Sequence, residues 1–160
     1  MNKWHNGFDP VINELSKVLI LGSFPSVKSR AQGFYYGNPQ NRFWKVLATI
    51  TNSDIPVTLE EKKALLKKHH IALWDTLKSC EIVGSADSSI KNAVPNDLSI
   101  ILDNAKIKAI YVNGKTSKAY YDKYLKAQTG IDAICLPSTS PANAVFSMQK
   151  LIESWKVILQ

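Results

Sequence analysis

The side chains best suited to chemistry fall in four polar segments, each of which directly follows a short apolar run. These segments span residues 22–41, 75–96, 113–117 and 137–143. Together they supply aromatic rings, amides and hydroxyls, whereas Asp75 and Asp87 are the only carboxylates clearly placed in them. This inventory suits an enzyme that positions a water molecule and polarises a bond, rather than one that relies on a strong acid or base.

Several common kinds of active site lack their residues in this chain. None of the histidines at positions 5, 69 and 70 follows a strand at the expected site, which disfavours a serine hydrolase that uses Ser23 or Ser138. Cys80 and Cys135 are far apart and form no ligand pattern with the histidines. Glycine-rich nucleotide-binding motifs are also missing from the sequence. We therefore expect neither a metal ion nor a cofactor.

Four apolar runs predict the strands that must position the polar segments. They lie at residues 17–21, 71–74, 109–112 and 133–136. Amphipathic patterns predict helices at about 43–50, 58–70, 97–104, 116–127 and 144–158. Strands that alternate with helices are typical of the α/β class, with a parallel sheet covered on both faces. Because the carboxyl ends of parallel strands meet at one edge, the polar segments should form one composite site.

Local signals refine this outline at two places. Thr58 and Glu61 have the spacing of a capping box, so they predict the start of the second helix. Residues 76–96 are polar and show no clear period, so we expect an irregular connection there.

Length and composition limit the class of protein. The 160 residues favour one domain, and an apolar content of 45% is ordinary for a globular chain. The net charge of +7 favours a polyanionic partner such as nucleic acid. No apolar stretch is long enough to span a membrane, and the N-terminus lacks the apolar core of a signal peptide. These features predict a cytoplasmic protein without membrane association.

Two motifs in combination resemble a known enzyme superfamily. The segments GSFPSVKSRAQGFYYGNPQNRFW and LPSTSPANAVFSMQKL together resemble the uracil-DNA glycosylases, and most closely the hypoxanthine-DNA (DNA-deoxyinosine) glycosylase family, which is related to the G:T/U mismatch-specific branch. The middle blocks IALWDTLKSCEIVGSADSSIKNAVPNDL and YVNGKTSKAYYDKY extend the likeness over nearly the whole chain.

The resemblance implies a fold and an activity. The fold is a single domain over residues 1–160, a three-layer αβα sandwich around a short, mainly parallel four-stranded sheet. The activity is monofunctional DNA N-glycosylase repair of deaminated bases, chiefly hypoxanthine, with uracil and xanthine as further candidates. Such an enzyme extrudes the base from single- or double-stranded DNA before it cleaves the N-glycosidic bond, and it acts as a monomer without metal or cofactor.

The catalytic residue is the point at which this sequence departs from the mismatch-specific branch. That branch has a water-positioning asparagine at the position of Phe24, and phenylalanine cannot take that role. The resemblance to the hypoxanthine-type family places the functional asparagine in the YYGNPQN block instead, which implies Asn41, with Asn38 as the second choice. Asn41 could equally cap the helix that begins next to it, since asparagine is a favourable cap.

The resemblance also implies a set of base-binding residues. Tyr36 matches the aromatic residue that stacks on the extruded base, and Tyr35 would shape the pocket wall. Backbone amides at Ser23 and Phe24 would bind the base edge. Asp75 ends the second predicted strand, where a neutral or ionised carboxyl could read the N–H donors of hypoxanthine, or could instead cap the next turn.

The segment after the last strand matches the loop that grips DNA. Ser138 and Ser140 would bind phosphate, and Ala142 with Asn143 would fill the space left by the extruded base. Ser140 or Asn143 could also cap the final helix, and both roles are compatible because helix N-termini bind phosphate. Lys115 is a weaker phosphate candidate. Related uracil-specific enzymes have a histidine where this chain has leucine (position 136), so one source of leaving-group stabilisation is missing.

A second class of function competes with the enzyme. The same fold could serve as a non-catalytic nucleic-acid binding module, and the loss of the asparagine at position 24 favours that alternative. A module of this kind should bind DNA with strong salt dependence and leave every base attached.

Overall fold

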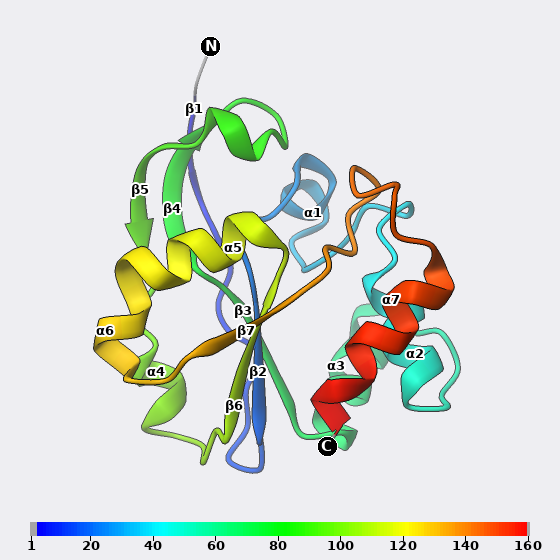
Figure 1. The fold of residues 1–160 in the computed structure, drawn as a ribbon. Helices are drawn as coiled ribbons and strands as arrows, with labels where there is room; N and C mark the ends of the chain where they lie inside the picture. Colours follow the sequence, from blue (N-terminus) through cyan, green and yellow to red (C-terminus); the bar gives the residue numbers. More distant parts are fainter. Residues whose placement is uncertain (1–2, 160) are drawn as a thin grey trace.

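A four-stranded parallel sheet forms the centre of the molecule (Figure 1). The computed structural model describes residues 3–159, and the sheet has the order β3-β2-β6-β7. The strands are β2 (Val18–Gly22), β3 (Ile71–Asp75), β6 (Ala109–Asn113) and β7 (Ala133–Leu136). Every residue of β2 and β3 is buried, as expected for apolar runs in a sheet covered on both faces. The four predicted strands are therefore confirmed.

Helices cover both faces of this sheet (Figure 1). One layer contains α2 (Phe43–Ile50), α3 (Leu59–Lys68) and α7 (Met148–Trp155). The other contains α4 (Ser99–Leu102), α5 (Lys115–Tyr120) and α6 (Lys126–Thr129), with a π-helical turn at Tyr121–Leu125 joining the last two. The three-layer αβα sandwich is thus confirmed. The capping box is present as well, because Thr58 accepts from the Glu61 amide and the Glu61 carboxylate accepts from the Thr58 amide.

A second sheet, which the sequence did not predict, lies beside the first (Figure 1). It is antiparallel, with the order β1 (Lys3–Asn6), β4 (Leu77–Ile82) and β5 (Lys91–Pro95). The expectation of an irregular connection over 76–96 was therefore wrong. Only some side chains of β4 are buried, and they form a small core with Phe24, so the strand shows no continuous apolar run.

Two further boundaries differ from the expectations. The segment after β2 contains a short helix, α1 (Val27–Gln32), which Ser26 caps and Gly33 ends with a φ of 77°. The final helix begins at Met148 with Ser147 as its cap, so neither Ser140 nor Asn143 caps it. As a result, the connection after β7 runs through residues 137–147, and we call it the 137–147 segment.

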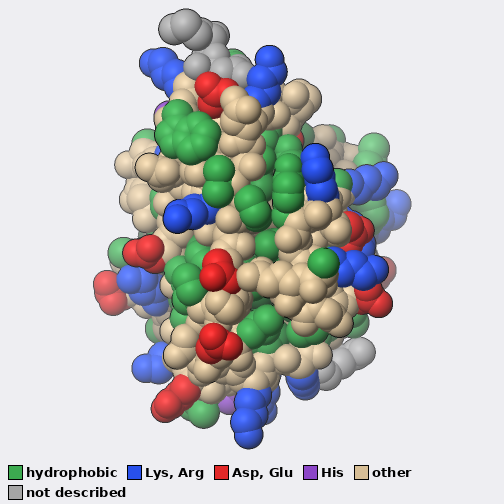
Figure 2. Space-filling model, turned by 90° about the vertical axis from the view of Figure 1, so that its left-hand side faces the viewer, with side chains coloured by type: hydrophobic (Ala, Val, Ile, Leu, Met, Phe, Trp, Pro, Cys, Tyr) green, Lys and Arg blue, Asp and Glu red, His purple; other side chains and the backbone are tan. Residues whose placement is uncertain are grey.

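The outer surface of the second sheet and of the α4–α6 layer has mixed character. Figure 2 shows this face with apolar patches among both basic and acidic side chains, so the net positive charge is not concentrated on it. Within residues 3–159, no helix has the length and apolar character that a membrane span requires.

Candidate functional site

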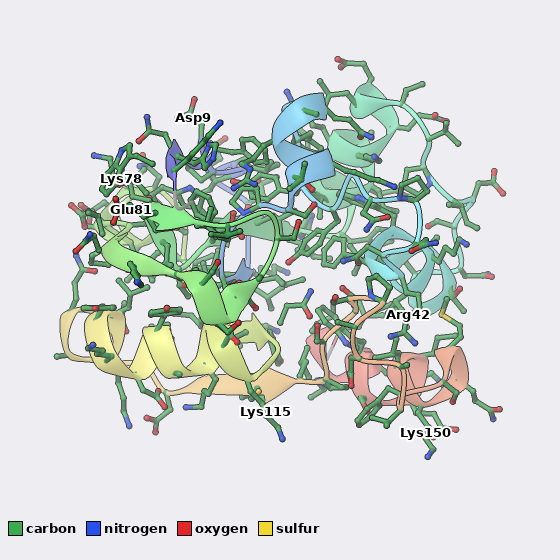
Figure 3. The ribbon with its side chains drawn as sticks, turned by 90° about the horizontal axis from the view of Figure 1, so that it is seen from above. Asp9, Arg42, Lys78, Glu81, Lys115 and Lys150 are labelled. Carbon is green, nitrogen blue, oxygen red and sulfur yellow. The ribbon has the colours of Figure 1, made fainter. Side chains whose placement is uncertain are left out.

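A cavity of about 320 Å³ opens at the carboxyl ends of β2, β3 and β6, and residues 138–142 of the 137–147 segment line one side of it. Figure 3 looks onto this edge of the molecule. Eleven of the residues singled out in the sequence line the cavity: Ser23, Phe24, Tyr35, Tyr36, Asn38, Asn41, Asp75, Asp87, Ser138, Ser140 and Ala142. The four polar segments thus meet at one edge, as their positions after parallel strands predicted.

A second hollow, of about 560 Å³, lies next to the first. Lys115 and Asn143 line this hollow rather than the cavity, together with the exposed Cys135. Ser138 and Ser140 line both spaces, so the 137–147 segment separates them. Lys115 extends outward from the start of α5 (Figure 3).

Asp75 lies in the wall of the cavity with a buried oxygen that has no partner. Its side chain is 4% exposed, and Oδ2 makes no hydrogen bond within the described residues. Burial, with a smaller contribution from the Asp87 carboxylate, raises the pKa of Asp75 to about 7. The backbone carbonyl of Asp75 accepts from Nδ2 of Asn96, which follows β5, at 2.8 Å, and this bond leaves the carboxyl itself free. A buried polar atom of this kind is where a ligand can supply the missing hydrogen bond.

Gly22 makes room for this carboxyl. A Cβ at position 22 would lie 2.6 Å from Asp75 Oδ1 and 3.0 Å from Tyr36 Oη. Any larger residue would displace one of the two groups, so the glycine at the end of β2 allows Asp75 and Tyr36 to share the cavity wall.

The Tyr36 ring is held flat against the core. It stacks on Phe43 with ring centroids 4.0 Å apart and an interplanar angle of 19°. Its backbone has a φ of 51°, which is uncommon for a tyrosine, and its hydroxyl accepts from Asn113 Nδ2 at 3.2 Å. Burial, reinforced by Asp75, raises the pKa of the phenol, so the ring stays neutral. Because Phe43 covers one face of the ring, the opposite face is the one available to a flat ligand.

Asn41 is oriented by two hydrogen-bond donors. Its Oδ1 accepts from the Phe43 amide at 3.0 Å and from Thr139 Oγ1 at 2.8 Å. The first bond satisfies the amide of the first residue of α2, but the N-cap position belongs to Arg42, so Asn41 is not the N-cap that the alternative expected. The second ties it to the 137–147 segment. Both lone pairs of Oδ1 are thereby used, so Asn41 can act on a ligand or a water molecule only through the N–H groups of Nδ2.

Asn38, the second choice for this role, also lines the cavity. Its Oδ1 accepts from the Gln40 amide at 3.0 Å, and its carbonyl accepts from the Asn41 amide at 2.9 Å. Asn38 therefore shapes the turn that leads into Asn41.

Thr139 and Asn113 are the two site residues that sequence reasoning missed. Thr139 is fully buried, and Asn113 is half-buried at the end of β6. Asn113 Nδ2 donates to Thr139 Oγ1 at 3.0 Å, and the Thr139 amide donates to Asn113 Oδ1 at 3.1 Å. The signal available for Asn113 was its place at the end of a predicted strand; nothing in the pattern distinguished Thr139 from its neighbouring hydroxyl residues.

Ser23 and Phe24 lie at the other end of the cavity wall. Ser23 Oγ donates to Asp87 Oδ1 at 3.3 Å. Burial raises the pKa of the Asp87 carboxyl, although hydrogen bonds from Ser23 and Thr116 act in the opposite direction. The Phe24 ring packs into the small core of the second sheet, and the Arg30 guanidinium lies 5.8 Å from the ring centroid. The Phe24 ring therefore belongs to this small core while also lining the cavity.

Arg42 holds the 137–147 segment against α2. Its guanidinium donates to the carbonyl oxygens of Ser140 and Asn143 at 3.0 Å each, and to that of Phe146. Its side chain lies between the start of α2 and this segment (Figure 3). The segment also braces itself, since Asn143 Nδ2 donates to the Ser138 carbonyl at 3.0 Å. Pro141 and Ala142 are exposed at the surface of this segment.

The arrangement can bind a flat, polar molecule and hold water beside it. Tyr36 provides a ring face, Asp75 a buried carboxyl and Asn41 a fixed N–H donor. Among residues 3–159, no group of three or more histidine, cysteine or acidic side chains is arranged to hold a metal ion.

Comparisons with known proteins agree with this geometry. The sequence profile of the uracil DNA glycosylase superfamily matches residues 10–158. A protein named hypoxanthine DNA glycosylase from Methanosarcina barkeri is 38% identical over 86% of this chain and 87% of its own length. Another of the same name, from Methanosarcina acetivorans, is 35% identical over 96% of this chain and 97% of its own.

A solved structure extends the likeness to three dimensions. It is a solution NMR structure from Methanosarcina acetivorans with a provisional assignment as a uracil DNA glycosylase. It superimposes with a TM-score of 0.84 at 34% identity, covering 98% of this chain and 97% of that one. The profile, the relatives and the superposition all span nearly the whole chain, and the chain belongs to the uracil DNA glycosylase superfamily.

Proposed function

We propose that this protein is a monofunctional DNA glycosylase that releases hypoxanthine from DNA, with uracil and xanthine as further substrates, and leaves an abasic site. The observation that carries the proposal is the buried Asp75 carboxyl in the wall of a cavity that a stacked tyrosine and a fixed asparagine also line. Its Oδ2 has no hydrogen-bond partner among residues 3–159. Two relatives named hypoxanthine DNA glycosylase support it. One chain supplies the whole cavity, so we expect the monomer to be active.

Base recognition would rest on Tyr36 and Asp75. The free face of the Tyr36 ring stacks on the extruded base. A protonated Asp75 matches the lactam edge of hypoxanthine, because its carbonyl oxygen accepts from N1–H while its hydroxyl donates to O6. The N3–H and O4 edge of uracil has the same pattern. Selection of damaged bases also gains from DNA itself, since a deaminated base pairs poorly and is extruded at lower cost.

The bond cleavage would follow a dissociative course. The bond between C1′ and the base nitrogen breaks, and its electron pair leaves with the base. The Asp75 hydroxyl stabilises the charge that develops at O6, and a proton from solvent neutralises the departing base. Asn41 Nδ2 donates to a water molecule and directs its remaining lone pair at C1′. The water oxygen then bonds to C1′ and releases its proton to solvent.

DNA binding would depend on the basic charge and on the 137–147 segment. Ser138 and Ser140 contact the backbone near the extruded nucleotide, and Lys115 contacts a phosphate beside the second hollow. Ala142, together with Pro141, enters the space that the base leaves. Asn143 contributes mainly by bracing the segment, given its bond to the Ser138 carbonyl.

The direct test is cleavage of defined oligonucleotides. Duplexes and single strands with one deoxyinosine, deoxyuridine or deoxyxanthosine are incubated with excess protein, and abasic sites are then converted to strand breaks with alkali. We expect breaks at deoxyinosine, and none in the matched strand with deoxyadenosine. Salt-dependent binding without breaks on any substrate would reject the enzyme and favour a nucleic-acid binding module instead.

A further inference from the structure

We propose that Thr139 is a positioning residue for catalysis: its buried hydroxyl fixes the amide of Asn41 so that the N–H groups of Nδ2, and not Oδ1, face the reacting sugar. The inference rests on the proposed glycosylase function and assigns a role to a residue that touches neither base nor DNA in that mechanism. A continuous set of hydrogen bonds among side chains supports this role. Two backbone N–H groups, which can only donate, determine which atom donates and which accepts in each of these bonds.

The orientation of Asn41 begins at a backbone amide. The Phe43 N–H can only donate, so the Asn41 atom that it contacts at 3.0 Å must be the carbonyl oxygen. Thr139 Oγ1 lies 2.8 Å from the same oxygen. With two donors on Oδ1, no lone pair remains for the catalytic water, and Nδ2 is the group left to bind it.

The orientation of the Thr139 hydroxyl begins at a second backbone amide. The Thr139 N–H donates to Asn113 Oδ1 at 3.1 Å, so Asn113 must present Nδ2 to its other partners. Nδ2 donates to Thr139 Oγ1 at 3.0 Å and to Tyr36 Oη at 3.2 Å. A hydroxyl that accepts from Asn113 has its single proton free for Asn41 Oδ1. The direction of every bond in the set is therefore determined.

The position of Thr139 depends in turn on Arg42. The Arg42 amide donates to the Thr139 carbonyl at 3.0 Å, and its guanidinium holds three further carbonyls of the 137–147 segment. Thr139 is fully buried, so its hydroxyl has no competing contact with solvent. The segment that would grip DNA thus also fixes the amide that would hold the water.

The role predicts a specific kinetic signature. Without the hydroxyl, Asn41 keeps only the bond from the Phe43 amide, and its side chain is free to leave the geometry required for attack. The rate of base release should then fall while DNA binding stays unchanged, because Thr139 has no surface with which to contact DNA.

The test compares Thr139→Ser with Thr139→Ala, two variants that differ only by the hydroxyl oxygen. Single-turnover release of hypoxanthine and DNA affinity by fluorescence anisotropy are measured for both. We expect the serine variant to stay within about threefold of wild type, and the alanine variant to lose about tenfold or more in rate with its affinity unchanged. Thr51→Val is the matched control, since it removes a threonine hydroxyl bonded to the Leu47 carbonyl at the far end of α2.

A double-mutant cycle separates positioning from general damage. In an Asn41→Ala background, Thr139→Ala should reduce the rate by less than about twofold, because the amide on which it acts is gone. Multiplicative losses, or equal rates for the serine and alanine variants, would overturn the inference. Each of these results requires an active wild-type protein, so failure of the inference is distinct from failure of the proposed function, in which wild type itself releases no base.

Discussion

Asp75 and Asn41 line the same cavity, yet their polar atoms are in opposite states. Asp75 Oδ2 is buried without a hydrogen bond from any residue of the described part of the chain, whereas both lone pairs of Asn41 Oδ1 are occupied by donors within the protein. A buried atom without a partner costs free energy until a ligand satisfies it, whereas a fully bonded amide is fixed before the ligand arrives.

The difference separates recognition from catalysis. In the proposed mechanism Asp75 binds the base, because the carboxyl gains its missing hydrogen bond only when a base enters. Asn41 is suited to hold water, because attack on the sugar requires an N–H group in a fixed position. Changes at the two residues should therefore differ in kind as well as in size.

The largest effect is expected from removal of the Asn41 amide. Asn41→Ala deletes the N–H donor that positions the water in the proposed mechanism, so the rate of hypoxanthine release should fall by about 100-fold or more. Single-turnover cleavage of a deoxyinosine duplex measures it. Asn104→Ala, at an exposed asparagine after α4, is the control and should keep full activity. Full activity of Asn41→Ala would remove Asn41 from the mechanism and turn attention to Asn38.

A pH profile tests which form of Asp75 acts. In the proposed mechanism the protonated carboxyl donates to O6. Because the pKa of Asp75 is raised to about 7, the wild-type rate should be level below pH 7 and fall about tenfold per unit above it. Asp75→Asn retains one acceptor and one donor but does not titrate, so its rate should stay level across this range. A wild-type rate that rises through pH 7 would show that the ionised carboxylate is the active form.

A smaller effect is expected when Arg42 no longer holds the 137–147 segment in place. Arg42→Gln removes the guanidinium from the carbonyls of Ser140, Asn143 and Phe146, and the freed segment should weaken DNA binding by about five- to tenfold. Fluorescence anisotropy at fixed salt measures the affinity. Lys45→Gln removes the same charge from the exposed face of α2 and should change affinity by less than about twofold. Equal losses in the two variants would mean that charge alone, and not the contact, accounts for the effect.

Much of the fold and the meeting of the site residues could be predicted from the sequence. A strand such as β2 is buried along its whole length, so it appears as an uninterrupted apolar run that ends at Gly22. Parallel strands bring their carboxyl ends together. Asp75 stands at the end of one apolar run, and Asn41 lies in the polar segment that follows another, so both could be placed at the same edge of the sheet. Local hydrogen bonds such as the capping box of α3 were equally readable.

The features that the sequence did not reveal depend on contacts between distant residues. β4 mixes buried and exposed positions, and its partner β1 is far away in the chain, so neither gives a local period. Thr139 contacts Asn41 across 98 positions, and no spacing rule connects them. The direction of that bond follows from two backbone amides whose relative position exists only in the folded chain.

The contrast between the two residues should also appear in stability, as the smallest of the expected effects. The pKa of Asp75 is about 7 in the folded protein and near 3.9 in the unfolded chain, so the folded protein binds the extra proton between these values. The free energy of unfolding therefore receives a contribution from Asp75 that declines as pH rises from about 4 to about 7 and is constant above that.

Asp75→Asn abolishes this titration, so the variant should gain stability relative to wild type as pH rises through that window, by a margin on the order of 2 to 4 kcal/mol. Urea unfolding at pH 4.5 and pH 7.5 gives the difference in free energy of unfolding between the variant and wild type at each pH. Comparing the two differences cancels any cost of the buried amide that does not depend on pH. Asp54→Asn, at an exposed aspartate between α2 and α3, is the matched control. If the difference between Asp75→Asn and wild type were the same at both pH values, Asp75 would have a partner that satisfies its charge, and the contrast with Asn41 would disappear.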